Sequence, residues 1–178
     1  MKITIHQLET NNPFWQELLK ELANYYEGKL ELVFPKELNK HYFSWFHKLE
    51  EWGFRRELQY TYEQLENNLE KPETILWFLT VDDKPQIVYY GYPIEQKNKK
   101  NFYLDTFAVQ PRGKGIGNIV IEFIIQWAKT KKYSSIILDT ELKDEKGIPL
   151  KQFYEKHGFE IISSSEKGDL IMKRNLAK

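Results

Sequence analysis

The feature that most constrains this fold is a glycine-rich loop between a strand pattern and a helix pattern. Residues 102–109 read as a strand, and the apolar residues of 116–127 recur at helical spacing. Glycines in the loop let the backbone take positive φ and approach a ligand closely. N–H groups at the start of a helix are unpaired and lie at the positive end of its dipole, which favours anions. The segment therefore predicts a phosphate-binding loop, made of Arg112, Gly113, Lys114, Gly115, Ile116, Gly117 and Asn118.

Two common phosphate-binding loops can be compared with this spacing. A Walker-type loop needs Ser or Thr after its Gly-Lys pair, but Gly115 follows Lys114 here. A dinucleotide fingerprint needs its third glycine one position later than Gly117. Asp139, at the end of the next predicted strand, could act as the ribose-binding carboxylate, so this alternative stays open. About sixty residues follow the loop, which is too few for a second nucleotide-binding half.

The remaining patterns predict a mixed α+β order with one βαβ-like crossover in the second half. Residues 29–35 are only a weak apolar stretch, and 95–101 is expected to be a polar loop. The predicted helices are 13–25, 39–52, 62–69, 116–127 and 149–157. The predicted strands are 2–8, 74–81, 86–92, 102–109, 135–138, 159–163 and 170–173, with residues 82–85 turning between the second and third of them.

Composition limits the function classes. A length of 178 residues predicts one domain, residues 1–178. With 26 basic and 26 acidic side chains the chain lacks the basic excess of a nucleic-acid binder, so no nucleic-acid partner is expected. No stretch approaches the ~18 apolar residues of a membrane span. The absence of cysteine fits a reducing compartment, so a cytoplasmic location is expected. No metal is expected, because no metal-ligand spacing links His6, His41, His47 and His157.

A second motif follows the glycine loop. Residues 150–159 end in Phe153-Tyr154-Glu155-Lys156-His157-Gly158-Phe159, a helix pattern closed by a glycine. This segment resembles the F/L-Y-x-K-x-G-F signature of the GNAT superfamily of acyl-CoA-dependent N-acetyltransferases. The earlier loop, Arg112 to Gly117, resembles that family's R/Q-x-x-G-x-G/A motif. The resemblance covers residues 102–160, about a third of the chain.

The resemblance implies a three-layer α/β/α fold with a twisted, mostly antiparallel sheet. A parallel pair of strands, here those ending at Val109 and Leu138, would splay apart at the acyl-CoA site. It also implies that residues 102–160 bind acetyl-CoA and that the helical region 28–70 faces the acceptor. The backbone of the loop would hold the pyrophosphate, with Asn118 beside it, and the pantetheine arm would lie along Phe107, Ala108 and Val109. An extended amide arm can pair with exposed main-chain groups as an added strand does.

The expected chemistry is transfer of an acetyl group to a primary amine of a small molecule, peptide or protein by direct attack on the thioester. The resemblance implies that Tyr154 is the general acid for the leaving thiolate, whereas spacing alone favours a polar-tipped member of an apolar stripe. Asp105 or Glu141 is a candidate base; the alternative is that both are solvated carboxylates and that water carries the proton. Many members have an asparagine where this chain has Gly147, which removes that side-chain contact with the cofactor arm. The runner-up function is an acyl-CoA-binding regulatory or interaction module with little turnover.

Aromatic residues make up 15% of the chain, and many of them crowd into residues 40–62 beside several glutamates. One hypothesis is an aromatic and acidic pocket for a cationic amine, to which cation–π contacts would contribute. The other is that these side chains fill the core of a helical insertion. An exposed aromatic surface there could also form a homodimer contact. The aromatics are Tyr42, Phe43, Trp45, Phe46, Trp52, Phe54, Tyr60 and Tyr62, and the glutamates include Glu50, Glu51, Glu57 and Glu63.

Overall fold

The computed structural model describes residues 4–6, 13–35, 37–144 and 147–176. Its helices are α1 (Pro13–Leu22), α2 (Lys40–Glu50), the short 3-10 helix η1 (Arg56–Leu58), α3 (Tyr62–Leu69), α4 (Ile116–Thr130) and α5 (Leu150–Lys156). Its strands are β1 (Thr4–His6), β2 (Leu30–Val33), β3 (Ile75–Val81), β4 (Lys84–Gln96), β5 (Lys99–Val109), β6 (Ser135–Glu141), β7 (Glu160–Ser164) and β8 (Asp169–Asn175). None of the described helices is long and apolar enough to cross a membrane.

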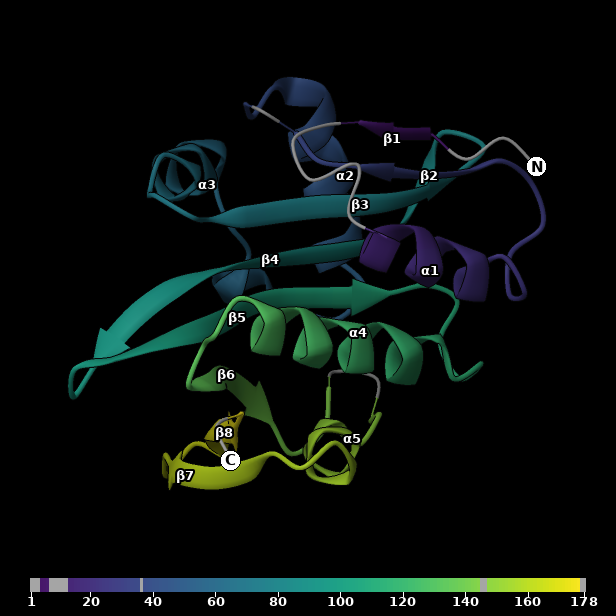
Figure 1. The fold of residues 1–178 in the computed structure, drawn as a ribbon. Coiled ribbons are helices and arrows are strands. Elements are labelled where there is room, and N and C mark those ends of the chain that lie inside the picture. The colour runs from purple at the N-terminus through teal and green to yellow at the C-terminus, as the bar shows by residue number, and fades with distance from the viewer. Residues whose placement is uncertain (1–3, 7–12, 36, 145–146, 177–178) are drawn as a thin grey trace.

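The strands form one sheet in the order β1-β2-β3-β4-β5-β6-β8-β7 (Figure 1). The central pair β5 and β6 is parallel, and β1 and β2 form a second parallel pair that the sequence did not predict. All other neighbouring strands run antiparallel. The predicted mixed, mostly antiparallel sheet is therefore confirmed. The dinucleotide-binding alternative is wrong, because β5, which leads into the glycine loop, pairs antiparallel with β4 instead of standing in a parallel sheet.

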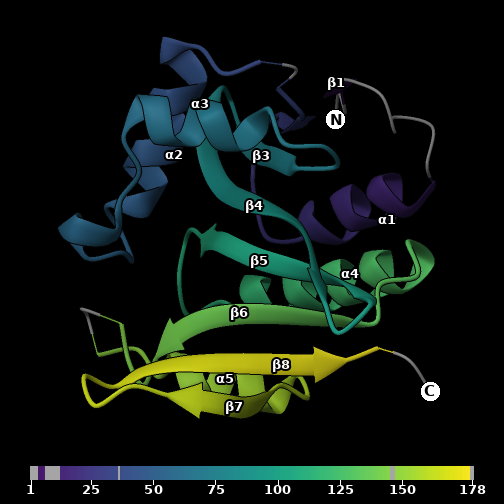
Figure 2. The same ribbon diagram turned by 90° about the vertical axis from the view of Figure 1, so that its left-hand side faces the viewer.

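Helices cover both faces of the sheet, as the three-layer prediction requires (Figure 2). On one face α1 and α4 enclose a core of tryptophan, phenylalanine and aliphatic side chains. In α4 the buried residues Val120, Ile124 and Trp127 recur every three or four positions, which places them on one stripe of the helix. On the other face α2 and α3 cover a smaller cluster that includes Phe46, Leu65 and Phe78.

Two predicted segments need correction, and a third is described only in part. Residues 30–33 lie in a region predicted to be helical, yet they form β2 between β1 and β3. The predicted polar loop 95–101 is mostly strand, because β4 and β5 continue until only Lys97 and Asn98 connect them, with φ of 51° and 60°. Two residues at positive φ match the right-handed twist of a long hairpin. Of the predicted strand 2–8, β1 is described as Thr4–His6, and the other residues lie outside the described part.

Most of the aromatic residues of 40–62 belong to the second core. Phe46 is fully buried, and Tyr42, Phe43, Trp45 and Tyr62 pack around the same cluster. This arrangement supports the core hypothesis for these five side chains. Phe54 and Tyr60 pack against the same cluster and also line the pocket described below. Trp52 differs, because it is 44% exposed.

Candidate active site

The two central strands separate soon after they meet. β5 and β6 are in parallel register only at Phe102–Ile136 and Tyr103–Ile137. Beyond these pairs, residues 104–109 keep their ladder with β4, while β6 continues its ladder with β8. The sheet therefore opens into a wedge between β5 and β6, as the predicted splayed pair requires.

A β-bulge turns one carboxylate into this wedge. Tyr90 of β4 faces Thr106, and the next residue, Gly91, faces Leu104, so Asp105 is the extra residue of the bulge. Bulges re-aim side chains and commonly do so beside functional sites. Gly91 is required here, because a Cβ atom would lie 2.5 Å from the carbonyl oxygen of Tyr103.

The Asp105 carboxylate is surrounded by hydroxyl donors. Tyr60 Oη donates to it over 2.7 Å, Thr106 Oγ1 over 2.9 Å and Tyr92 Oη over 3.5 Å. Burial raises the pKa of Asp105, and the hydrogen bonds from Tyr60 and Thr106 partly oppose that rise. The carboxylate is thus oriented, and its affinity for a proton is increased.

A pocket of about 560 Å³ fills the wedge. It contains aromatic and aliphatic walls, several carboxyl groups and two arginines. The residues that line it are Glu50, Gly53, Phe54, Arg55, Leu58, Tyr60, Tyr103, Leu104, Asp105, Thr106, Phe107, Arg112, Asp139, Thr140, Glu141, Asp144, Leu150, Tyr154, Ser163, Ser164, Ser165, Asp169 and Ile171.

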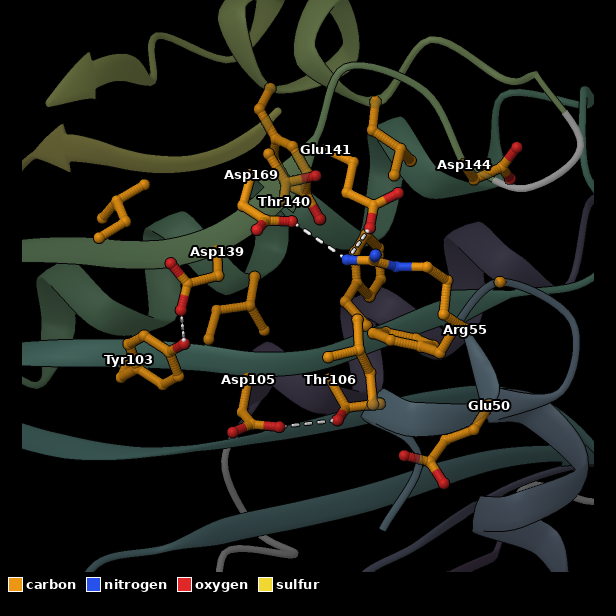
Figure 3. A pocket seen from close by; sticks show the side chains of 18 of the residues that line it. Glu50, Arg55, Tyr103, Asp105, Thr106, Asp139, Thr140, Glu141, Asp144 and Asp169 are labelled. Atoms are coloured by element: carbon orange, nitrogen blue, oxygen red, sulfur yellow. Dashed lines mark hydrogen bonds and ion pairs between the residues drawn. The ribbon is translucent and has the colours of Figure 1, made fainter. Parts of the chain in front are cut away.

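The wall opposite Asp105 is acidic (Figure 3). Arg55 Nη2 lies 2.6 Å from Glu141 Oε1 and 3.1 Å from Asp169 Oδ1, so one guanidinium group bridges the ends of β6 and β8. On the same wall Asp139 accepts a short hydrogen bond from the Tyr103 hydroxyl, which links β6 to β5 where they separate.

Glu50 is a second buried carboxyl group of the pocket. It is 1% exposed, and both of its oxygens accept from the Tyr60 N–H over 3.3 Å. Burial raises the pKa of Glu50 to about 8; the Tyr60 hydrogen bond opposes this shift and the nearby Asp105 adds to it. Tyr60 therefore contacts two carboxyl groups, Glu50 through its backbone and Asp105 through its hydroxyl.

Tyr154 reaches the pocket from α5 and is 8% exposed. Its ring packs edge-on against Phe153 and Phe159, which fixes its direction. Burial raises the pKa of the Tyr154 phenol, so the hydroxyl keeps its proton at neutral pH and is suited to donate it.

The glycine loop has the backbone that an anion site needs. Gly113 and Gly115 have φ of 79° and 80°, and no atom lies within 4 Å of where a Cβ on Gly113 would be. Gly115 is the N-cap of α4 and provides no side-chain cap, so the first N–H groups of the helix are left for another acceptor. The loop therefore fits the diphosphate of acetyl-CoA. Gly117 is already helical, and an added Cβ would be in ordinary contact, 3.5 Å from Phe153.

The polar side chains of the loop point to different partners. Arg112 forms a short ion pair with Asp144 and lines the pocket, and burial lowers its pKa. Asn118 Oδ1 lies 2.9 Å from His157 Nε2, which joins the start of α4 to the end of α5. Lys114 is exposed.

The structure brings several predicted residues into one pocket: Phe107, Asp105, Glu141, Arg112 and Tyr154. Ala108 and Val109, by contrast, pack into the cores on opposite faces of the sheet. Sequence reasoning missed Arg55, Tyr103 and Asp169. Arg55 and Asp169 reach the pocket from segments far from the two motifs, whereas Tyr103 lies on β5, two residues before Asp105. Among the described residues, no group of three or more His, Asp or Glu side chains could hold a metal ion.

Comparisons with known proteins agree with this geometry. No curated protein sequence matches the chain. Several solved structures share its fold. The NatC complex bound to Gag peptide and CoA matches with a TM-score of 0.61 and 18% identity, over 83% of this chain and 99% of that one. The ribosomal-protein-S18-alanine N-acetyltransferase of Escherichia coli matches with a TM-score of 0.61 and 14% identity, over 84% and 95%.

The PaiA N-acetyltransferase of Thermoplasma acidophilum in complex with coenzyme A gives a TM-score of 0.59 at 16% identity, over 82% of this chain and 98% of that one. At these identities the likeness shows the fold alone. The sequence itself matches the family model described as Acetyltransferase (GNAT) family over residues 36–159. That range is more than half of the chain and contains both motifs, the splayed strands and most of the pocket, so the protein belongs to the GNAT acetyltransferase family.

Proposed function

We propose that the protein transfers an acetyl group from acetyl-CoA to a primary amine. The observation that carries this proposal is that Asp105 and Tyr154 line one pocket in the wedge between β5 and β6. A buried carboxylate and a protonated phenol are the two groups that amine attack on a thioester needs. Membership of the GNAT acetyltransferase family and the CoA-bound neighbours support the same reaction.

The residues that would hold acetyl-CoA are mainly backbone groups. The N–H groups of 113–117 would bind the diphosphate at the start of α4. The open edge of β5, residues 104–109, would pair with the amides of the pantetheine arm. Bound there, acetyl-CoA supplies the acetyl group as a thioester.

Asp105 and Tyr154 divide the proton transfers. The acceptor arrives as an ammonium ion, and the ionised carboxylate of Asp105 accepts one of its protons, which frees the nitrogen lone pair to attack the thioester carbon. One N–C bond forms and one C–S bond breaks, and Tyr154 gives its hydroxyl proton to the departing sulfur. The acylated nitrogen then returns its surplus proton to the Tyr154 phenolate, and Asp105 releases its proton to solvent. We assign the base to Asp105 in preference to Glu141, because Glu141 is held in an ion pair with Arg55. An ion-paired carboxylate is a weaker proton acceptor.

Two measurements test this function. Calorimetric titration with acetyl-CoA, CoA, NAD and ATP is expected to show selective binding of the two CoA species. CoA release with a panel of amines is then expected to fall ~10²–10⁴-fold in Tyr154→Phe, while acetyl-CoA still binds. Tyr89→Phe is the matched control, since Tyr89 is a fully buried tyrosine outside the pocket, and its activity should match that of the unmodified protein.

The same measurements distinguish an acetyltransferase from the runner-up function. Tight acetyl-CoA binding without CoA release from any amine would favour an acyl-CoA-binding module. Absence of CoA binding would contradict both functions.

A further inference from the structure

The pocket is lined by more carboxyl groups than cationic groups. Its lining contains six carboxyl groups and two guanidinium groups. With a pKa of about 8, Glu50 is mostly uncharged at neutral pH, which leaves five carboxylates for two cations. The whole chain has 26 basic and 26 acidic side chains, so this excess is local to the pocket. The carboxyl groups are Glu50, Asp105, Asp139, Glu141, Asp144 and Asp169, and the guanidinium groups belong to Arg55 and Arg112.

Both arginines are already engaged. Arg112 is paired with Asp144. Arg55 is shared between Glu141 and Asp169, and one positive charge cannot neutralise two carboxylates. The hydrogen bond from Tyr103 orients Asp139 but, being neutral, cancels none of its charge. A negatively charged acceptor would therefore meet repulsion in this pocket, and a cation would be attracted.

The carboxylates lie on two sides of the wedge. Asp105, the base of the proposed reaction, stands on the β5 side of the wedge, whereas Asp139, Glu141 and Asp169 stand on the opposite side (Figure 3). Aromatic side chains line the same pocket beside Asp105, among them Tyr60, Tyr103 and Phe107. Aromatic faces attract ammonium groups and also pack against methylene groups. The volume of about 560 Å³ has to hold the acetyl end of the cofactor as well as the acceptor, so the acceptor must be small.

We infer that the acceptor is a small aliphatic polyamine, which presents one amine to Asp105 and holds a second ammonium group against Asp139, Glu141 and Asp169. This inference rests on the proposed acetyl transfer and names the acceptor of the same site. Arg55 then has a second role, because it keeps Glu141 and Asp169 together until an ammonium group shares them. A single amine without the second charge would gain only the contacts near Asp105.

Three acceptors of equal chain length test the inference: cadaverine, n-pentylamine and 5-aminopentanoate, whose tails are cationic, neutral and anionic. We expect kcat/KM for cadaverine to exceed that for n-pentylamine at least ~10-fold, which corresponds to ~1.4 kcal/mol. The anionic acceptor should be the poorest. The double variant Asp139→Asn, Asp169→Asn should reduce the ratio of cadaverine to n-pentylamine towards one. Glu155→Gln, which removes an exposed acid of α5 outside the pocket, should leave the ratio unchanged.

Binding provides a second readout that needs no turnover. With CoA present, calorimetry should show tighter binding of cadaverine than of n-pentylamine, and added salt should weaken the difference. Equal kcat/KM values for the two amines would overturn the polyamine assignment and leave acetyl transfer standing. Preference for 5-aminopentanoate would also overturn the polyamine assignment, and would indicate that Arg55 binds the tail of the acceptor. If acetyl-CoA does not bind, the proposed function and the acceptor assignment both fail.

Discussion

The substitution Glu50→Gln tests whether Glu50 is buried in its protonated, neutral form. Glu50 is 1% exposed and its pKa is raised by burial to about 8 from an ordinary value of 4.5. Glutamine has nearly the same shape as protonated glutamate but cannot ionise. The substitution therefore removes the titration and keeps most of the packing.

The size of the effect follows from the two pKa values. Below 4.5 both the folded and the unfolded chain carry the proton, so Glu50 has no pH-dependent effect on stability. Between 4.5 and about 8 the unfolded chain has lost the proton and the folded chain retains it. The folded state then loses ~1.4 kcal/mol of stability per pH unit as pH rises. From about pH 5 to about pH 7 the loss is ~3 kcal/mol.

Urea unfolding of both proteins at about pH 5 and about pH 7 measures this loss. The free energy of unfolding of Glu50→Gln relative to the unmodified protein should rise by ~3 kcal/mol between the two conditions. At a slope of ~2 kcal/mol per M urea, the relative midpoint moves by more than ~1 M. Glu51→Gln, one residue further along and with a side chain 60% exposed, should show no such trend. Identical pH dependence of the unmodified protein and Glu50→Gln would refute a neutral buried Glu50.

Three further substitutions examine the wedge. Gly91→Ala should lower the free energy of unfolding, measured with urea, by ~2 kcal/mol, because its Cβ would overlap the Phe102 ring. The control Gly117→Ala, whose Cβ meets only ordinary contacts, should change the free energy of unfolding by less than ~1 kcal/mol. Equal losses in the two variants would contradict the bulge geometry. Tyr60→Phe removes the 2.7 Å hydrogen bond that holds down the pKa of Asp105, so the acidic limb of the kcat/KM profile should move to higher pH. An unchanged limb would exclude Asp105 as the base.

The sequence was sufficient for the parts of the site that depend on local structure. The glycine loop predicted the start of α4 correctly at Ile116. The second motif placed Tyr154 on a short helix, and α5 covers 150–156. In both places short-range rules apply, namely glycine at positive φ and a helix closed by a glycine.

The sequence contains a signal for the bulge, which is a break in the alternation of apolar and polar residues along β5. Phe102 and Leu104 face the α4 side of the sheet, and so do Phe107 and Val109. The spacing of three between Leu104 and Phe107 breaks the period of two, and Asp105 is the extra residue. A break of period inside an apolar strand can therefore be used to predict where a bulge redirects a side chain.

The acidic wall could not be predicted, because it depends on long-range packing. Arg55 meets Asp169 across 114 positions of the chain and crosses from the α2–α3 segment to β8. No periodicity links such residues. The outer end of the hairpin of β4 and β5 was missed for another reason: its last residues, Glu95, Gln96, Lys99 and Lys100, are polar and exposed, so they lack the buried stripe that identifies a strand.

The short register between β5 and β6 has a mechanical consequence. Each side of the wedge has its own hydrogen-bond ladder, β5 with β4 and β6 with β8, whereas β5 and β6 are in register with each other at two residue pairs. A small rotation about that junction widens or narrows the wedge without breaking either ladder. The hydrogen bond from Tyr103 to Asp139 spans the wedge beside that junction. We therefore expect the width of the wedge to change through side-chain contacts of this kind, while the sheet itself stays intact.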